Sequence, residues 1–179
     1  MDNALTPVPA DFSVKQGRDV YLRENGFTVE SYDEKWTQAS FFGLKFSVPN
    51  TSAHRRAIMW HDLHHVATAY GTDLIGEGEI SAWELRRGLK GLDLYVSSIV
   101  VGGALMGLFL APRRTLQAFR AAAQHGHGRN LFALELSEYE ALLRLDVASL
   151  REKLGVPRGG LASSHQLHAY APAPAASPR

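Results

Sequence analysis

HDLHHVATAYGTDLIGE, residues 61–77, is the stretch of the chain that decides its fold. Asn50 or Thr51 can cap a helix that runs through its first half to Tyr70, and Gly71 can end that helix. Asp73 then offers the cap of a second helix. The stretch therefore predicts two helices joined by a short turn.

The second helix reaches Arg87, where Gly88 can stop it. If the two helices are antiparallel, His65 lies about 9 Å before the turn and Glu77 about 6 Å after it, at 1.5 Å per residue. The two side chains then come level across the hairpin.

The polar residues of the first helix have the spacing of metal ligands. On a helix, His65 is turned by about 40° from His61, and Asp62 by about 100°, so the three share one face. With Glu77 they offer two imidazoles and two carboxylates, and the chain has no cysteine that could replace them. This ligand set favours Zn²⁺, with Fe²⁺, Mn²⁺ or Mg²⁺ as alternatives. The competing interpretation is a set of hydrogen-bonded structural residues.

Other polar residues near this group are not predicted to bind the metal. His64 is predicted either to hydrogen-bond to the ligands, without contacting the metal, or to lie at the surface. Glu84 returns to nearly the face of Glu77, so Glu84 and Tyr70 are the candidates for proton transfer or orientation. Glu79 turns to the opposite side, where solvent or a basic partner would meet it.

The rest of the chain reads as one all-α, mainly helical domain over residues 14–157. The Pro-containing segments 1–13 and 158–179 are predicted to be flexible tails. Aromatic and β-branched residues around Gly43 indicate a short β-hairpin near residues 36–48. Further helices are expected at 113–124, at 138–145 behind a Ser137-x-x-Glu140 capping box, and at 147–154.

Residues 94–112 carry no charge, a length at which a membrane span becomes a candidate. The small residues within this segment suit a buried helix equally well, and a buried helix is our prediction. Their pattern is also compatible with a homodimer. Arg113, Arg114 and Arg120 could hold a phosphate or an anionic membrane surface, or form a solvated helix end.

Composition and the absence of certain motifs exclude some classes of function. The 19 basic and 18 acidic residues give a net charge of +1, which argues against nucleic-acid binding. The N-terminus lacks the basic and apolar regions of a secretion signal, so a cytoplasmic protein is expected. Gly102-Gly103 lies inside an apolar run and is no nucleotide-binding fingerprint. Four further histidines are interpreted as surface residues: His125, His127, His165 and His168.

The motif His61-Asp62-x-x-His65, followed by eleven residues and Glu77, resembles that of the ubiquinone (coenzyme Q) biosynthesis protein 4 family. The similarity extends over about residues 55–88. It implies a mostly helical protein, peripheral to membranes, whose metal is held by His61, Asp62, His65 and Glu77. It also implies a channel for an isoprenoid tail and partner enzymes of one pathway.

Three functions remain open. The resemblance implies a metal-dependent enzyme that acts on the ring of a prenylated quinone precursor or a related small molecule, by decarboxylation or similar Lewis-acid chemistry. A non-catalytic isoprenoid-binding scaffold would use the metal to fix the hairpin. A zinc hydrolase would use Asp62 as general base, in a variant of His-Glu-x-x-His.

Overall fold

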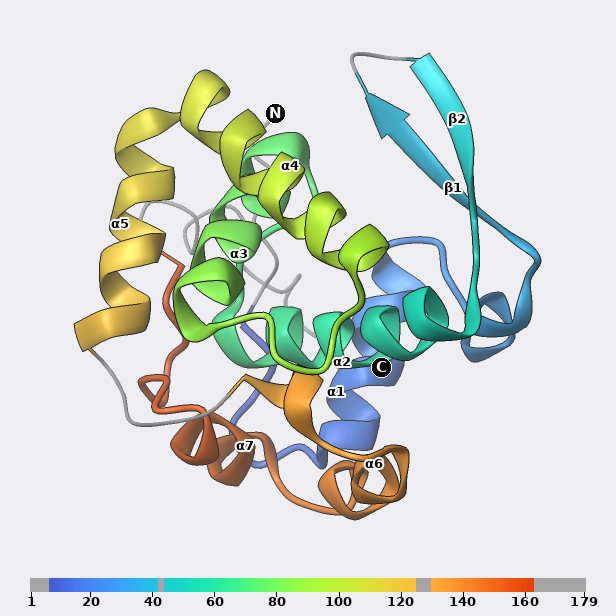
Figure 1. Ribbon diagram of the computed structural model, residues 1–179. Coiled ribbons are helices and arrows are strands. Elements are labelled where there is room, and N and C mark those ends of the chain that lie inside the picture. The colour runs from blue at the N-terminus through green and yellow to red at the C-terminus, as the bar shows by residue number, and fades with distance from the viewer. Residues whose placement is uncertain (1–6, 42–43, 125–129, 163–179) are drawn as a thin grey trace, which may run out of the picture.

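The computed structural model describes residues 7–41, 44–124 and 130–162 and is mainly helical, as the sequence predicted (Figure 1). Its principal helices are α1 (Val14–Glu24), α2 (Ser52–Thr68), α3 (Leu74–Arg87), α4 (Leu94–Leu110), α5 (Pro112–Gln124), α6 (Leu136–Leu143) and α7 (Val147–Lys153). Short 3-10 helices η1 (Val29–Asp33) and η2 (Leu131–Ala133) and strands β1 (Trp36–Phe41) and β2 (Leu44–Pro49) complete the described part.

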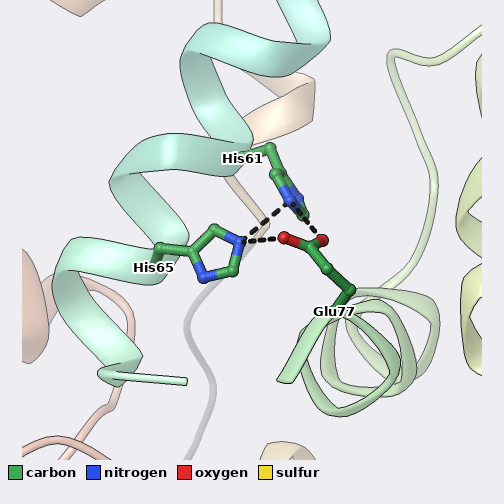
Figure 2. A group of neighbouring side chains, drawn as sticks. All are labelled: His61, His65 and Glu77. Atoms are coloured by element: carbon green, nitrogen blue, oxygen red, sulfur yellow. Dashed lines mark hydrogen bonds and ion pairs between the residues drawn. The ribbon is translucent and has the colours of Figure 1, made fainter. Parts of the chain in front are cut away.

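Helices α2 and α3 follow one another across the short turn that the sequence predicted. They do not form the predicted antiparallel hairpin: Figure 2 shows α2 from the side and α3 end-on, and α3 packs mainly against α4 and α5. The Thr51 hydroxyl accepts a hydrogen bond from the His54 amide, and the Asp73 carboxylate accepts one from the Gly76 amide, so both predicted caps are present. Helix α2 ends at Thr68 with Ala69 in the left-handed conformation (φ 64°), earlier than the predicted Gly71 stop. Gly76 leaves room for the backbone of Gly71: a Cβ on Gly76 would lie 2.2 Å from the Gly71 carbonyl oxygen.

Strands β1 and β2 pair antiparallel with Trp36 opposite Pro49, and this confirms the predicted β-hairpin. The hairpin extends away from the helices in Figure 1. The Asn50 side chain fixes its base, donating hydrogen bonds to the carbonyl oxygens of Tyr32 and Glu34. Asn50 therefore anchors the hairpin, and Thr51 alone caps α2.

Helix α4 packs on α3 through paired glycines. A Cβ on Gly78 would lie 2.4 Å from the Gly107 Cα, so the two backbones are in direct contact. The opposite face of α4 is open: Leu94, Leu105 and Phe109 are 87%, 62% and 78% exposed. The prediction of a buried helix is therefore wrong for half of its surface. In the described part of the chain, no helix has the length and apolarity needed to cross a membrane.

The folded region extends beyond the predicted domain limits at both ends. Val8 is buried, and the amide of Ala148 donates to the Ala10 carbonyl oxygen. At the other end, the Leu161 amide donates to the Thr68 carbonyl oxygen at the end of α2. Residues 7–13 and 158–162 thus belong to the fold, whereas the rest of both predicted tails lies outside the described residues.

The buried Arg151 guanidinium ties these segments together. It donates to four backbone carbonyl oxygens, those of Val8, Val66, Ala67 and Arg158. Because two of them belong to the last turn of α2, this one side chain holds both ends of the folded region against the helix that carries the histidines.

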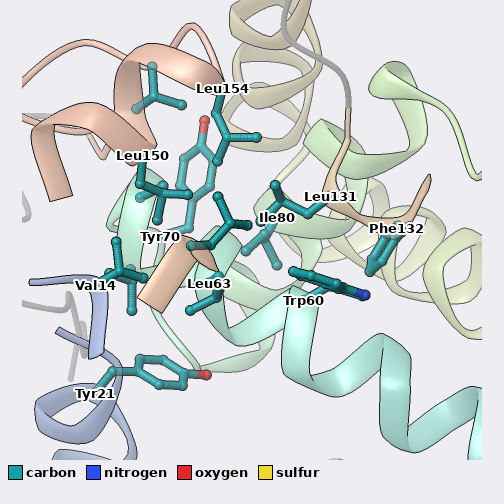
Figure 3. Close-up of a cluster of buried hydrophobic side chains, with 14 of the residues drawn as sticks. Val14, Tyr21, Trp60, Leu63, Tyr70, Ile80, Leu131, Phe132, Leu150 and Leu154 are labelled. Atoms are coloured by element: carbon teal, nitrogen blue, oxygen red, sulfur yellow. The ribbon is translucent and has the colours of Figure 1, made fainter. Parts of the chain in front are cut away.

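The remaining helices differ in detail from the sequence prediction. Helix α7 follows its predicted cap, Asp146, whose carboxylate accepts from the Ser149 amide. Helix α6 begins earlier than predicted, because Glu135 and Glu138 form the capping interaction in place of Ser137 and Glu140. Figure 3 shows the core, to which α1, α2, α3, η2 and α7 contribute apolar side chains, with Trp60, Leu63 and Ile80 fully buried.

The glycine contact between α3 and α4 predicts opposite effects for two substitutions. Gly78→Ala should lower the free energy of unfolding by about 1–3 kcal/mol, because the added methyl group meets backbone. Gly102→Ala, at a position with nothing within 4 Å, should raise it by about 0.5–1 kcal/mol through helix propensity. Urea unfolding measures both, and equal effects at the two sites would contradict the packing described.

Candidate metal centre

Three of the predicted ligands converge between α2 and α3 (Figure 2). His61 and His65 lie one turn apart on α2, and Glu77 reaches them from the first turn of α3. The His61 and His65 Nε2 atoms are 3.0 Å apart. The Glu77 carboxylate oxygens lie 3.3 Å from the first nitrogen and 3.4 Å from the second.

The hydrogen bond of each Nδ1 atom sets which nitrogen of that imidazole ring carries the proton. His61 Nδ1 lies 2.8 Å from a carboxylate oxygen of Glu84, and His65 Nδ1 lies 3.0 Å from the Tyr70 carbonyl oxygen. Both partners are acceptors, so both Nδ1 atoms must donate. In the neutral rings, both Nε2 atoms then present lone pairs to each other and to the Glu77 carboxylate. Such a cluster of acceptors needs a cation or a proton at its centre.

The spacing of the candidate ligand atoms is compatible with a single metal ion. Ligands bound at about 2.0–2.1 Å and separated by about 90–110° lie about 3.0–3.4 Å from one another. The two Nε2 atoms are 3.0 Å apart, and each lies 3.3 or 3.4 Å from a different oxygen of the Glu77 carboxylate. His61, His65 and Glu77 therefore form a group that could hold a divalent ion.

Charge is concentrated in this region. Burial opposes protonation of His61, but the carboxylates of Glu84 and Glu77 raise the pKa of its ring above the ordinary value. Burial would likewise raise the pKa of Glu77, yet the neighbouring His65 and His61 lower it. Glu77 is therefore ionised at neutral pH, as a metal ligand must be.

Asp62, the fourth predicted ligand, has a different neighbour. Its Oδ2 accepts a hydrogen bond of 2.5 Å from the Tyr32 hydroxyl, and it lies outside the described group whose ligand atoms are within 4.8 Å of one another. Burial raises the pKa of its carboxyl group. In this structure Asp62 contacts Tyr32 and is not one of the three residues that converge.

Glu84 and His64 lie behind His61 and are fully buried. The same Glu84 oxygen that accepts from His61 also accepts from His64 Nδ1 at 2.8 Å. His64, predicted to be a supporting or surface residue, is therefore a supporting one. Tyr70 touches the site through its backbone carbonyl, while its ring lies in the core (Figure 3).

The sequence prediction missed two aromatic residues of the site. Tyr21 stacks on His65 with ring centroids 5.3 Å apart, and Tyr32 holds Asp62. Tyr21 comes from α1, whose start carries a signal that could have revealed it: Ser13 and Gln16 form a capping box. Nothing in the sequence pairs Tyr32 with Asp62, because that contact depends on how η1 packs on α2.

The predictions for Glu79 and for the histidines outside the site can also be compared with the structure. Glu79 points away from the site and binds the Arg114 guanidinium through both oxygens, at 2.9 and 2.8 Å. It thus has the basic partner that its helical position predicted. Four histidines predicted at the surface lie outside the described residues: His125, His127, His165 and His168.

The donor set restricts the identity of a bound ion. Two imidazoles and one carboxylate suit Zn²⁺, and the same three-residue set with open positions also holds Fe²⁺ in non-haem iron enzymes. Mn²⁺ or Mg²⁺ would prefer more oxygen ligands than these residues supply. The His61 and Glu77 side chains remain 24% and 39% exposed, so further ligands can reach the centre.

Comparison of the chain with models of protein families, with curated proteins and with solved structures found no match.

The geometry predicts different effects for two polar residues of α2. His65→Ala should weaken Zn²⁺ binding by at least about 100-fold, because it removes one of three ligands. Asp62→Asn should weaken it by less than about tenfold, because Asp62 contacts Tyr32. Competitive titration with a chromophoric chelator measures both, with circular dichroism to verify folding. Equal loss in the two variants would restore Asp62 as a ligand and contradict this account.

Proposed function

We propose that this chain is a metal-dependent enzyme in which His61, His65 and Glu77 hold the ion, and that the ion is zinc. The observation that carries the proposal is the pair of Nε2 atoms facing each other beside a carboxylate, 3.0 Å apart. The partial exposure of His61 and Glu77 supports access for a second molecule.

A divalent ion in this position would act as a Lewis acid on an oxygen of the substrate. The residues of the chain have separate tasks around it. Glu77 supplies negative charge from α3, and the Tyr70 carbonyl oxygen holds the His65 ring in place. Tyr21 covers the buried side of His65, so the approach from solvent lies on the side of His61 and Glu77.

The resemblance of the His61-Asp62-x-x-His65 and Glu77 motif to ubiquinone biosynthesis protein 4 suggests the substrate. We propose a prenylated aromatic precursor of a quinone, or a related small molecule, whose ring oxygen or carboxylate meets the ion. Decarboxylation would break the bond between the ring and its carboxyl carbon. The electron pair stays on the ring carbon, which takes a proton as carbon dioxide leaves.

A non-catalytic carrier of isoprenoid lipid is the second candidate. Neither of the residues considered for proton transfer favours the enzyme over the carrier: Glu84 is fully buried behind His61, and the Tyr70 ring is in the core. A zinc hydrolase has less support, because its general base would be Asp62, whose Oδ2 is held by Tyr32.

An exposed apolar surface supports contact with a lipid. It lies on α4 and α5 and we call it the α4–α5 face. Residues 94–124 contain three arginines and no acidic residue, and Arg113 and Arg120 are exposed. The face consists of Leu94, Ile99, Val101, Leu105, Leu108, Phe109, Leu116 and Phe119.

We propose that the α4–α5 face rests on an anionic membrane surface, where apolar side chains enter the lipid and arginines meet head groups. A second copy of the chain is a weaker fit, because a two-fold contact through this face would bring Arg113 and Arg120 near their own equivalents without an acid to pair them. Enzymes of the same pathway remain proposed partners from the resemblance.

Metal removal tests the enzymatic proposal. A short-chain prenylated hydroxybenzoic acid with a labelled carboxyl group should release labelled carbon dioxide with the metal-loaded protein. Chelation should abolish the release, and added Zn²⁺ or Fe²⁺ should restore it. The assay is run with and without oxygen, which would serve as electron acceptor for an oxidative route.

The same assay separates the candidates. Binding of the prenylated acid without release under any condition would favour the carrier. Release that survives both chelation and His65→Ala would contradict a metal-dependent enzyme.

Vesicle flotation tests the α4–α5 face. The protein should float with vesicles containing phosphatidylglycerol, and Leu105→Ser with Phe109→Ser should weaken binding at least about 100-fold, since each loses about 1.5–3 kcal/mol of apolar burial. Arg113→Gln should weaken it by roughly fivefold, from about 1 kcal/mol per basic residue. Phe27→Ser, at an exposed apolar residue on another surface, is the matched control.

Two results would contradict this placement. One is equal loss of flotation in the Phe27→Ser control. The other is a concentration-dependent dimer that the Leu105 and Phe109 substitutions disrupt, with no flotation by the unmodified protein.

A further inference from the structure

Glu84 is a buried carboxylate that the proposed function leaves without a task. Its side chain has no exposed surface, and one oxygen, Oε1, accepts from His61 Nδ1 and from His64 Nδ1, each at 2.8 Å. Within the described part of the chain its other oxygen, Oε2, is buried without a hydrogen-bond partner. A buried carboxylate with an unpaired oxygen is costly, so a role beyond packing has to account for it.

His64 connects Glu84 to a third part of the fold. Its Nε2 accepts a hydrogen bond from the Leu131 amide at 3.2 Å, so this nitrogen carries no proton. Its Nδ1 must then carry the proton that it donates to Glu84. The edges of Trp83 and Phe132 flank the ring, with centroids 5.2 and 5.1 Å away. His64 is therefore a neutral ring whose hydrogen bond holds the Glu84 carboxylate in one position.

We propose that Glu84 is the positioning residue of the metal centre. Through its hydrogen bond it fixes the orientation of the His61 ring and keeps the proton on Nδ1, which leaves Nε2 free to bind the ion. Together with Glu77 it supplies two negative charges, which match an ion of charge +2 in a site closed on its inner side. This inference rests on the proposed metal site.

A second buried carboxylate on the same helix provides the control. Glu79 is also buried on α3, but it binds Arg114 and does not touch a ligand. Glu84→Gln should lower Zn²⁺ affinity by about 10–100-fold, as loss of a partner behind a ligand does. Glu79→Gln should change affinity by no more than about threefold, although it breaks a buried ion pair and lowers thermal stability.

Ring-nitrogen NMR of the zinc-loaded protein gives a readout that a packing role would not move. The Nδ1 proton of His61 should resonate downfield, as expected for a bond to a carboxylate, and should shift upfield in Glu84→Gln. The Nδ1 proton of His65, which donates to the Tyr70 carbonyl oxygen, should stay in place. His64→Gln, which can both donate and accept, should preserve more of the affinity than His64→Leu.

The outcomes separate this inference from the metal site itself. If the unmodified protein binds none of Zn²⁺, Fe²⁺ and Mn²⁺, the proposed metal site fails. If it binds Zn²⁺ and Glu84→Gln binds equally well with an unshifted His61 proton, the metal site stands and the role of Glu84 is overturned. Equal losses of affinity in the Glu84 and Glu79 variants would also overturn it, since both would then act through stability.

Discussion

The structure depends on one electrostatic constraint: two imidazole nitrogens and a carboxylate point at the same small volume. The Nε2 atoms of His61 and His65 face each other because both Nδ1 protons are already committed, to Glu84 and to the Tyr70 carbonyl oxygen. Glu77 adds a negative charge to the same point. A group of acceptors this close is repulsive by itself and is relieved by a proton or by a cation, and the proposed metal ion would supply that cation.

Close backbone contacts fix the helices that carry these side chains. Gly76 lets the backbone of Gly71 pack directly against the start of α3, one residue before Glu77. Gly78 meets Gly107, so α4 fixes α3 from outside while its other face stays open. On the inner side, Arg151 binds carbonyl oxygens in the last turn of α2. The three converging side chains are thus held by helices that are themselves fixed by neighbouring elements.

The sequence was sufficient where local signals decide the outcome. The caps at Thr51 and Asp73 predicted two helices joined by a short turn, and the spacing of His61, His65 and Glu77 predicted that these residues converge. It was insufficient where tertiary packing decides. Helical angle alone put Asp62 with the ligands, whereas η1 brings the Tyr32 hydroxyl to its carboxylate.

The predictions were also wrong about how much of two segments is buried. A run of apolar residues does not reveal how much of a helix finds a partner, so α4 was expected to be buried and is half open. The Pro-containing segment before α1 was expected to be flexible, yet Val8 enters the core and Arg151 binds its carbonyl oxygen. In both cases the deciding contacts are with residues distant in the sequence.

Elemental analysis of the purified protein, combined with native mass spectrometry, tests the central claim most directly. The account predicts one divalent transition-metal ion per chain, retained through buffer exchange at neutral pH. A protein that carries no stoichiometric ion, and takes up none when Zn²⁺, Fe²⁺ or Mn²⁺ is supplied, would contradict it.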